Sequence, residues 1–467
     1  MPVQDGLPAP MRKRAVLVII LGITMAVLDG TIVNLALPSI ARELRAEASA
    51  SIWVVNAYQV ATLALLLPVA TLGDIVGYRR IYLWGIALFT LASVCCAMSG
   101  SLTGLAASRA LQGVGAAGIM SVNTALVRLI YPKAILGRGI AINTMVVATA
   151  SVAGPSIAAL ILSAASWPWL FAINLPLGLL TLLLGRRSLP DNAAPAAPGV
   201  RCAPLDIVLN ALSFGLIFLG VDGLGTGSGA APGGRPWLPW AQLGAGLVLA
   251  VIYLRRQRAE AVPLFPLDLL RIPVFALSMG TSVAAFCAQM LAYISLPFLL
   301  LETFGRSHLA AGLLMTTWPL AIVVAAPLAG RLIGRYPSGL LGGIGLTILA
   351  LGLALLAGLP AQPSNADIVW RMALCGLGFG LFQSPNNHTI ITSAPPARSG
   401  AASGMLGSAR LTGQTLGAVL LAIIFSFRGP HEGQGAVIAL ALAAACAAAA
   451  AVFSSLRLKT EIPAHAL

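Results

Sequence analysis

An aspartate and an arginine within apolar stretches are the residues best suited to chemistry in this chain. Asp29 follows an apolar run, residues 15–28, that carries no charge. An ionised carboxylate in hydrocarbon costs roughly 2.5–3.5 kcal/mol on insertion scales, so a function or a partner must retain it. Such a carboxyl group can exchange a proton within the physiological pH range. Asp29 is therefore a candidate proton site, and the alternative is a structural carboxylate tied to a backbone group or an arginine.

Arg109 is the predicted partner of Asp29. On a helix, its face reads Arg, Gln, Ala, Met and Asn, which is too polar for lipid; these are residues 109, 112, 116, 120 and 123. A buried arginine stays charged, so it must be paired or hydrated. The pattern predicts either a group that moves a proton between Asp29 and water or an ion pair that packs helices.

Membrane helices must position these residues. The chain of 467 residues is 58% hydrophobic and 9% charged, with a mean hydropathy of +0.92, whereas a soluble domain is about 25% charged. Its apolar runs approach the length of about 20 residues that a spanning helix needs, and they lack the alternation of a membrane barrel. We expect an all-α integral membrane protein with fourteen transmembrane helices, at roughly 15–37, 51–72, 80–99, 104–129, 138–162, 167–186, 204–223, 238–255, 273–301, 308–333, 338–358, 367–392, 401–427 and 434–456.

The basic residues are distributed unevenly between alternate loops. With the N-terminus in the cytoplasm, one side holds 20 of the 28 Lys and Arg residues and the other holds five, while Arg109, Arg371 and Arg410 fall inside spans. This bias follows the positive-inside rule and places both termini in the cytoplasm. The net charge of +14 therefore indicates membrane topology and not nucleic-acid binding. Of six cysteines, only Cys202 lies in a predicted loop, so no disulfide framework is expected.

Two ends of the chain resemble each other. ALQGVG at 110–115 recurs as ALCGLG at 373–378, and GDIVGYRR at 73–80 has a counterpart in GRLIGRYP at 330–337. An even number of spans separates the copies, which makes them a parallel repeat. We expect an N-terminal six-helix bundle at 1–189, two inserted helices with flanking linkers at 190–260, and a C-terminal six-helix bundle at 261–467.

The loop GDIVGYRR carries the first resemblance to a known family. Gly73 and Gly77 permit a tight turn, Asp74 can cap a helix or pair with a cation, and Arg79 and Arg80 anchor the next span. The loop resembles the signature of the major facilitator superfamily, which implies two six-helix halves and a latch of one conformational state through ion pairs between them. The alternative is an ordinary charged inner loop.

More closely, the chain resembles the fourteen-span drug:proton antiporters of that superfamily. The matching stretches are LDGTIVNLALP at 28–38, RALQGVGAAGI at 109–119 and AGPSIAALILSAASWPWLFAINLPLG at 153–178. The resemblance implies that Asp29 takes part in coupling, that Arg109 takes part in proton transfer, and that Gly154 and Pro155 belong to an antiporter motif. Ala158 and Ala159 depart from it, because the family has a glycine pair there.

The same resemblance implies which helices line a substrate cavity: the first and fourth of each half. Amides, aromatic rings and methionine on these helices suit amphipathic compounds. The candidates are Asn34, Gln112, Asn123, Phe286, Gln289, Met290, Tyr293, Arg371, Phe379, Phe382, Gln383 and Asn386. The alternative for each is ordinary packing between helices.

These observations favour a proton-coupled antiporter that exports amphipathic drugs or toxic compounds across the cytoplasmic (inner) membrane by alternating access. Its expected partners are a small-molecule substrate, protons and the lipid bilayer, and a monomer suffices. No metal-ligand spacing, phosphate loop or catalytic set suggests a cofactor or an enzyme.

Two alternatives remain open. Family members that favour dications carry further acids in the second half, where this chain has Glu302 at an outer edge together with Arg371 and Arg410. A dedicated exporter of one neutral or anionic metabolite is therefore the second hypothesis. A non-transporting membrane sensor is the third, and it predicts that Asp29 is dispensable.

Overall fold

The chain folds into long helices that pack side by side. The computed structural model describes residues 6–132, 135–190, 204–225, 235–259, 268–394, 399–428 and 433–458, so Cys202 lies outside the described residues. Within these ranges the secondary structure is helical apart from one isolated bridge between Ile333 and Tyr336. The expected all-α class is confirmed for this part of the chain.

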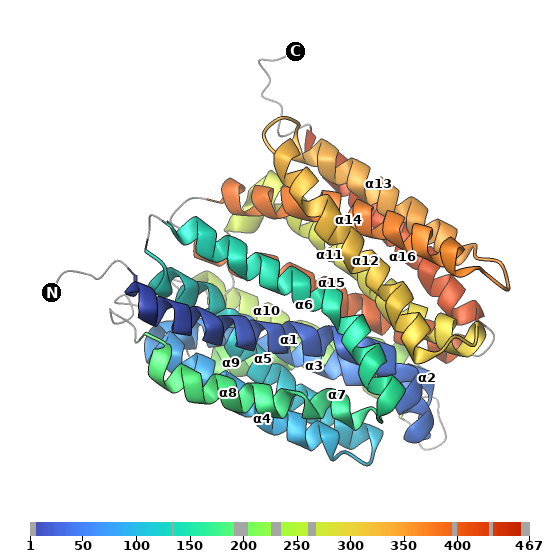
Figure 1. The fold of residues 1–467 in the computed structure, drawn as a ribbon, viewed down its shortest axis with the longest axis horizontal. Helices are drawn as coiled ribbons and strands as arrows, with labels where there is room; N and C mark the ends of the chain where they lie inside the picture. The colour runs from blue at the N-terminus through green and yellow to red at the C-terminus, as the bar shows by residue number, and fades with distance from the viewer. Residues whose placement is uncertain are drawn as a thin grey trace.

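An N-terminal bundle and a C-terminal bundle lie next to each other (Figure 1). The first contains α1 (Ala9–Glu43), α2 (Ala48–Ser51), α3 (Trp53–Val76), α4 (Tyr78–Ala97), α5 (Leu102–Ile130), α6 (Leu136–Ala164), α7 (Pro168–Ala172) and α8 (Asn174–Ser188). The second contains η3 (Leu269–Arg271), α11 (Pro273–Phe298), η4 (Leu299–Thr303), α12 (His308–Leu332), α13 (Ser338–Ala357), α14 (Asn365–Ser393), α15 (Ser399–Phe427) and α16 (Gln434–Leu456).

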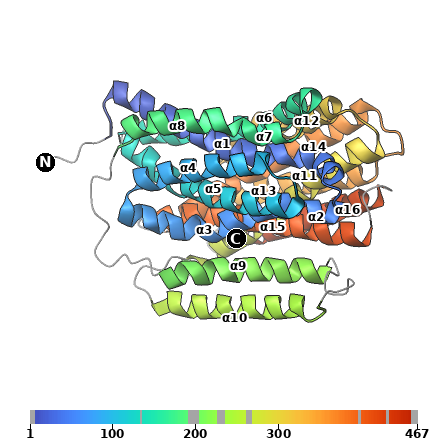
Figure 2. The same ribbon diagram turned by 90° about the horizontal axis from the view of Figure 1, so that it is seen from below.

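Between them in sequence, α9 (Pro204–Gly225) and α10 (Leu238–Ala259) form a hairpin (Figure 2). Asn210 of α9 donates a hydrogen bond to the carbonyl oxygen of Ala64 in α3, and Phe218 packs with Leu63 of α3 and Leu411 of α15. The hairpin is thus tied to the N-terminal bundle by a polar contact and lies across the seam where α3 meets α15.

Twelve helices in the described residues are long and apolar enough to cross a membrane. The apolar part of α9, Leu205–Val221, is shorter, and α14 is not among the twelve. Polar residues interrupt α14 at Arg371, Gln383 and Asn386, which lowers its mean hydropathy. The twelve long apolar helices show that the protein is a multi-pass helical membrane protein.

The ALQGVG and ALCGLG copies make corresponding contacts. A Cβ on Gly113 of α5 would lie 2.4 Å from the carbonyl oxygen of Tyr58, and one on Gly376 of α14 would lie 2.2 Å from that of Trp318. Because only glycine allows such close approach of two backbones, the repeated motif packs the fourth long helix of each bundle against its second.

The apolar core is distributed asymmetrically along the bundles. One cluster joins both bundles near the end where α1 stops and α3 starts, and its members include Ile40, Val54 and Leu296. Towards the chain termini, separate clusters occupy each bundle. In Figure 1 the bundles accordingly converge near α2 and diverge towards the ends marked N and C. The burial of apolar surface therefore holds the two bundles together mainly at the α2 end.

Candidate functional site

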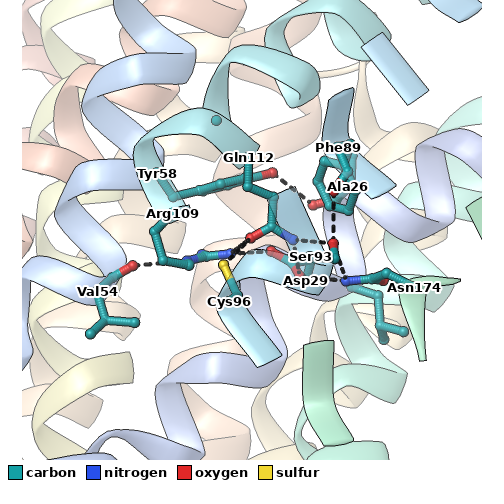
Figure 3. Close-up of polar contacts among 12 residues, drawn as sticks. Ala26, Asp29, Val54, Tyr58, Phe89, Ser93, Cys96, Arg109, Gln112 and Asn174 are labelled. Carbon is teal, nitrogen blue, oxygen red and sulfur yellow. Dashed lines mark hydrogen bonds and ion pairs between the residues drawn. The ribbon is translucent and has the colours of Figure 1, made fainter. Parts of the chain in front are cut away.

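Asp29 lies inside the N-terminal bundle at the centre of a polar network. Its side chain is 1% exposed. One carboxylate oxygen accepts hydrogen bonds from Nε2 of Gln112 and Nδ2 of Asn174, each at 2.8 Å, and the other accepts one from Arg109 (Figure 3). Three donors, one of them cationic, thus stabilise the ionised carboxylate in a water-poor interior.

Arg109 is fully buried and reaches Asp29 from α5. Its Nε donates to the carbonyl oxygen of Val54 at 2.9 Å, and its Nη1 donates to Gln112 as well as to Asp29. The guanidinium carbon lies 4.3 Å from the centre of the Tyr58 ring, which is a cation–π geometry. The predicted pairing of Asp29 and Arg109 is therefore present, and the arginine is fixed by contacts from several helices.

Further side chains hold the amides of Gln112 and Asn174 in place. Ser93 of α4 accepts hydrogen bonds from Gln112 at 2.9 Å and Asn174 at 3.3 Å, and it donates to the carbonyl oxygen of Phe89 at 2.8 Å. The Tyr58 hydroxyl donates to the carbonyl oxygen of Ala26 at 3.1 Å. Sequence reasoning missed Asn174, Ser93 and Tyr58; the available signal for Asn174 was a lone amide within an apolar run.

This network links the packing of several helices to one charged pair. Side chains from α5 and α8 bind the Asp29 carboxylate of α1, and Val54 of α3 and Ser93 of α4 bind those side chains in turn. A buried ion pair is sensitive to loss of one charge, at about 3–5 kcal/mol, because the other charge is then uncompensated. The contacts between these helices therefore depend on the charges of both Asp29 and Arg109.

The predicted aromatic residues are packed against one another in this conformation. The ring centres of Phe286 and Phe379 are 5.3 Å apart and those of Phe379 and Phe382 are 5.6 Å apart, with all three side chains buried. Tyr293 stacks edge-on against Trp318 at 5.1 Å. These residues form core contacts here, and a cavity wall would require the bundles to rearrange.

The amide side chains that were predicted to line a cavity do not share one site. Gln112 joins the Asp29 network, and Asn123 of α5 donates to Asn143 of α6 at 2.9 Å. Asn34 is 3% exposed, and its oxygen has no hydrogen-bond partner among the described residues. Gln289 of α11 is buried, and Gln383 of α14 is half-buried.

The structure does not bring Asn386 to the Asp29 network. Its amide donates to Ser282 at 2.8 Å and accepts from Arg457 at 2.8 Å, inside the C-terminal bundle. Arg457 is itself fully buried and also donates to Ser278 at 2.9 Å. Arg371 lies near the other end of α14, beside the ring of Trp370. Asn386 therefore belongs to a second polar cluster, centred on Arg457.

The GDIVGYRR loop connects α3 to α4. Gly77 has φ +113°, a conformation that favours glycine, and Gly73 packs against Val122. Asp74 accepts a hydrogen bond from Tyr78, and Arg79 donates to the carbonyl oxygen of Arg186. The contacts described for these side chains all lie within the N-terminal bundle. Arg80 is exposed.

Gly154 and Pro155 lie where α6 contacts α1 of its own bundle and α12 of the C-terminal bundle. A Cβ on Gly154 would be 2.1 Å from Oγ1 of Thr31 in α1, and the carbonyl oxygen of Pro155 lies 2.7 Å from where a Cβ on Gly312 in α12 would be. The adjacent Ser156 hydrogen-bonds Thr316 of α12 at 2.7 Å. The motif thus joins the helix that carries Asp29 to the opposite bundle.

We expect Gly154→Ala to destabilise the protein by about 1–3 kcal/mol, because the added methyl group overpacks the contact with Thr31. The matched control is Gly330→Ala in α12, where nothing lies within 4 Å of the added Cβ and the helix should gain about 0.5–1 kcal/mol. Thermal unfolding of both purified variants, followed by tryptophan fluorescence, measures the difference. Equal unfolding temperatures would contradict the assigned close contact.

The fold and the buried charge network define a membrane transporter built from two helical bundles. The family model of the Major Facilitator Superfamily matches residues 19–418 and 278–465. The chain belongs to this superfamily.

Individual relatives are also transporters. The chain is 54% identical over 454 residues to the "Uncharacterized transporter YebQ" of Escherichia coli (strain K12), with 97% of each chain covered. It is 31% identical to the riboflavin transporter RibZ of Clostridioides difficile (strain 630), with 89% of each covered. It is 30% identical to the multidrug efflux pump LfrA of Mycolicibacterium smegmatis, with 90% of this chain and 83% of that protein covered.

Solved structures share the fold at low sequence identity. A POT family transporter in complex with a thioalcohol-conjugated peptide superposes with a TM-score of 0.71 at 17% identity, covering 96% of both chains. A bacterial homologue of the human lysosomal transporter Spinster, in an inward-facing and unoccupied conformation, gives 0.67 at 15% identity, covering 97% of this chain and 98% of that one.

Proposed function

We propose that this transporter is a proton-coupled antiporter that exports amphipathic compounds across the cytoplasmic membrane by alternating access. The observation that carries the proposal is the Asp29 carboxylate, 1% exposed and held by Arg109, Gln112 and Asn174. A carboxylate so enclosed inside a membrane bundle is a functional-site hypothesis by default. The multidrug efflux pump among its relatives supports the export of toxic amphipathic compounds.

The proposed cycle uses the asymmetry of the core. Both termini are taken as cytoplasmic, so the α2 end faces outwards and the apolar cluster across it closes the outer side. Binding of a proton to Asp29 would free Arg109 and loosen α1 from α5, favouring rearrangement at the α2 end. The proton gradient supplies about 1.4 kcal/mol per pH unit and the membrane potential about 2.3 kcal/mol per charge per 100 mV.

The same proposal completes the topology. In it α9 and α14 also cross the membrane, giving fourteen spans, and the chain divides into bundles at 1–189 and 261–467 with the inserted pair at 190–260. The equivalent glycine contacts of Gly113 and Gly376 support the two-bundle division. The loop residues Asp74 and Arg79 would latch one state, and a monomer would carry out the whole cycle.

The experiment uses inverted membrane vesicles that contain the protein and hold a proton gradient. A panel of lipophilic cations, neutral drugs and organic anions is added, and proton release is followed with a pH-sensitive dye. We expect release that depends on substrate and is absent from vesicles without the protein. If no compound releases protons while labelled compounds still move into the vesicles, transport is not proton-coupled and the proposal is wrong.

A dedicated metabolite exporter is the second candidate. It is favoured by the riboflavin transporter among the relatives and by the arginines Arg371 and Arg410 in apolar helices of the C-terminal bundle. In the same vesicle assay, proton release by one compound class alone would favour it over a multidrug exporter.

A further inference from the structure

Arg410 of α15 lies at the seam between the two bundles. One turn before it, a Cβ on Gly407 would lie 3.2 Å from Leu66 of α3, and the next residue, Leu411, packs with Leu63 of α3. The guanidinium of Arg410 interacts electrostatically with Tyr58, which is also in α3. Arg410 therefore lies on the segment of α15 that packs against α3 of the N-terminal bundle.

The charge of Arg410 is not compensated by the described residues. Its Nε is buried and has no hydrogen-bond partner among them. Asp29, the carboxylate that acts on Tyr58, already accepts hydrogen bonds from Arg109, Gln112 and Asn174. The one carboxylate of the Asp29 network is therefore already engaged by Arg109. A half-buried cation with a buried, unpaired Nε is costly, so a counter-ion from outside the chain would stabilise it.

The surroundings of Arg410 also fit the remainder of an amphipathic anion. Gln59 of α3 is 4% exposed; its Nε2 contacts the sulfur of Met290 at 3.8 Å, while its Oε1 has no partner among the described residues. One turn after Arg410, the position of Gly413 lies against Phe286. The seam therefore offers a cation, a vacant hydrogen-bond acceptor and apolar surface from α11.

We propose that Arg410 binds the acidic group of the transported compound, so that the substrate class is an amphipathic organic monoanion, with a carboxylate as the best geometric match. This inference rests on the proposed transport function and assigns the charge of its substrate. A guanidinium binds a carboxylate with two parallel hydrogen bonds, which no neutral or cationic group can accept in the same way. Phe286 and Met290 are buried in this conformation. Once the bundles rearrange, the apolar body of the compound lies towards them and a donor group on it meets Oε1 of Gln59.

Binding to the full-length protein in nanodiscs tests the assignment without needing proton coupling. The probes are the aromatic carboxylate pyrenebutyrate, its uncharged amide, and a pyrenebutyl trimethylammonium cation, followed by energy transfer from tryptophan. We expect the wild type to bind the carboxylate at least about 10-fold more tightly than the amide, a difference of about 1.4 kcal/mol, because only the carboxylate forms charge-assisted hydrogen bonds with the guanidinium. Arg410→Gln should lose this preference while its affinity for the amide stays unchanged, and Arg410→Lys should keep part of it.

The matched control is Arg306→Gln. Arg306 is also half-buried with an Nε that lacks a partner among the described residues, but it lies beyond η4, where its Nη2 donates to the carbonyl oxygen of Pro363. It should retain the wild-type preference. Equal affinity of the wild type for the three probes, a preference for the cation, or a preference that survives Arg410→Gln would each overturn the assignment. If a cation drives Asp29-dependent proton release, the antiport proposal stands and the anion assignment is wrong. If the protein binds the carboxylate selectively but no compound causes proton release, the anion assignment stands and the antiport proposal is wrong.

Discussion

Replacing Asp29 by asparagine should abolish substrate-driven proton release and bring it to the level of vesicles without the protein. Asparagine has the size of aspartate and keeps one acceptor oxygen, but it cannot bind and release a proton in this pH range. Because the proposed cycle visits a state with a neutral Asp29, the bundle must tolerate an uncharged side chain at this position. The measurement is dye-reported proton release in inverted vesicles, with protein amount and unfolding temperature determined in parallel.

The matched control for this variant is Asp206→Asn. Asp206 is also a buried acid in an apolar helix, where it pairs with Nε of Arg256 at 2.8 Å, but it lies in the α9–α10 hairpin, outside the Asp29 network. Its proton release should remain near the wild-type level. Undiminished release by a folded Asp29→Asn variant would move the proton site elsewhere and refute the central assignment.

Removing Arg109 alone should lower the free energy of unfolding by about 3–5 kcal/mol, because the Asp29 carboxylate is left buried without its counter-ion. In Arg109→Gln, the bonds to Asp29 and to the carbonyl oxygen of Val54 are weakened or lost together. The double variant Asp29→Asn with Arg109→Gln removes both charges and should recover more than half of the lost stability. Neither variant should release protons.

A double-mutant cycle measures this coupling by denaturant unfolding in mild detergent. We expect an interaction energy of about 2–3 kcal/mol between the two positions, at the upper end of the range for residues in direct contact. Additive effects of the two substitutions would show that Asp29 and Arg109 are not paired in the folded protein. Recovery of stability without recovery of proton release would separate the structural part of the ion pair from its role in coupling.

The sequence was sufficient for the class of fold and for the main charged pair. Its low charge and its apolar runs required membrane helices, because charged surface is excluded from hydrocarbon. The cost of burying Asp29 and Arg109 also required each to have a partner, and the two side chains are paired. Exact helix ends were not predictable: the run expected at 15–37 is part of α1, Ala9–Glu43, since polar residues can extend a helix beyond the membrane.

Only the tertiary structure decided which polar residues share a site. Asn174 and Ser93 complete the Asp29 network from α8 and α4, although nothing in their local sequence relates them to residue 29. Asn386 was predicted to line the same cavity as Phe379 and Phe382, yet it pairs with Arg457 near the end of α16. Periodicity along one helix determines which side chains share a face, but the packing of the neighbouring helices decides what that face meets.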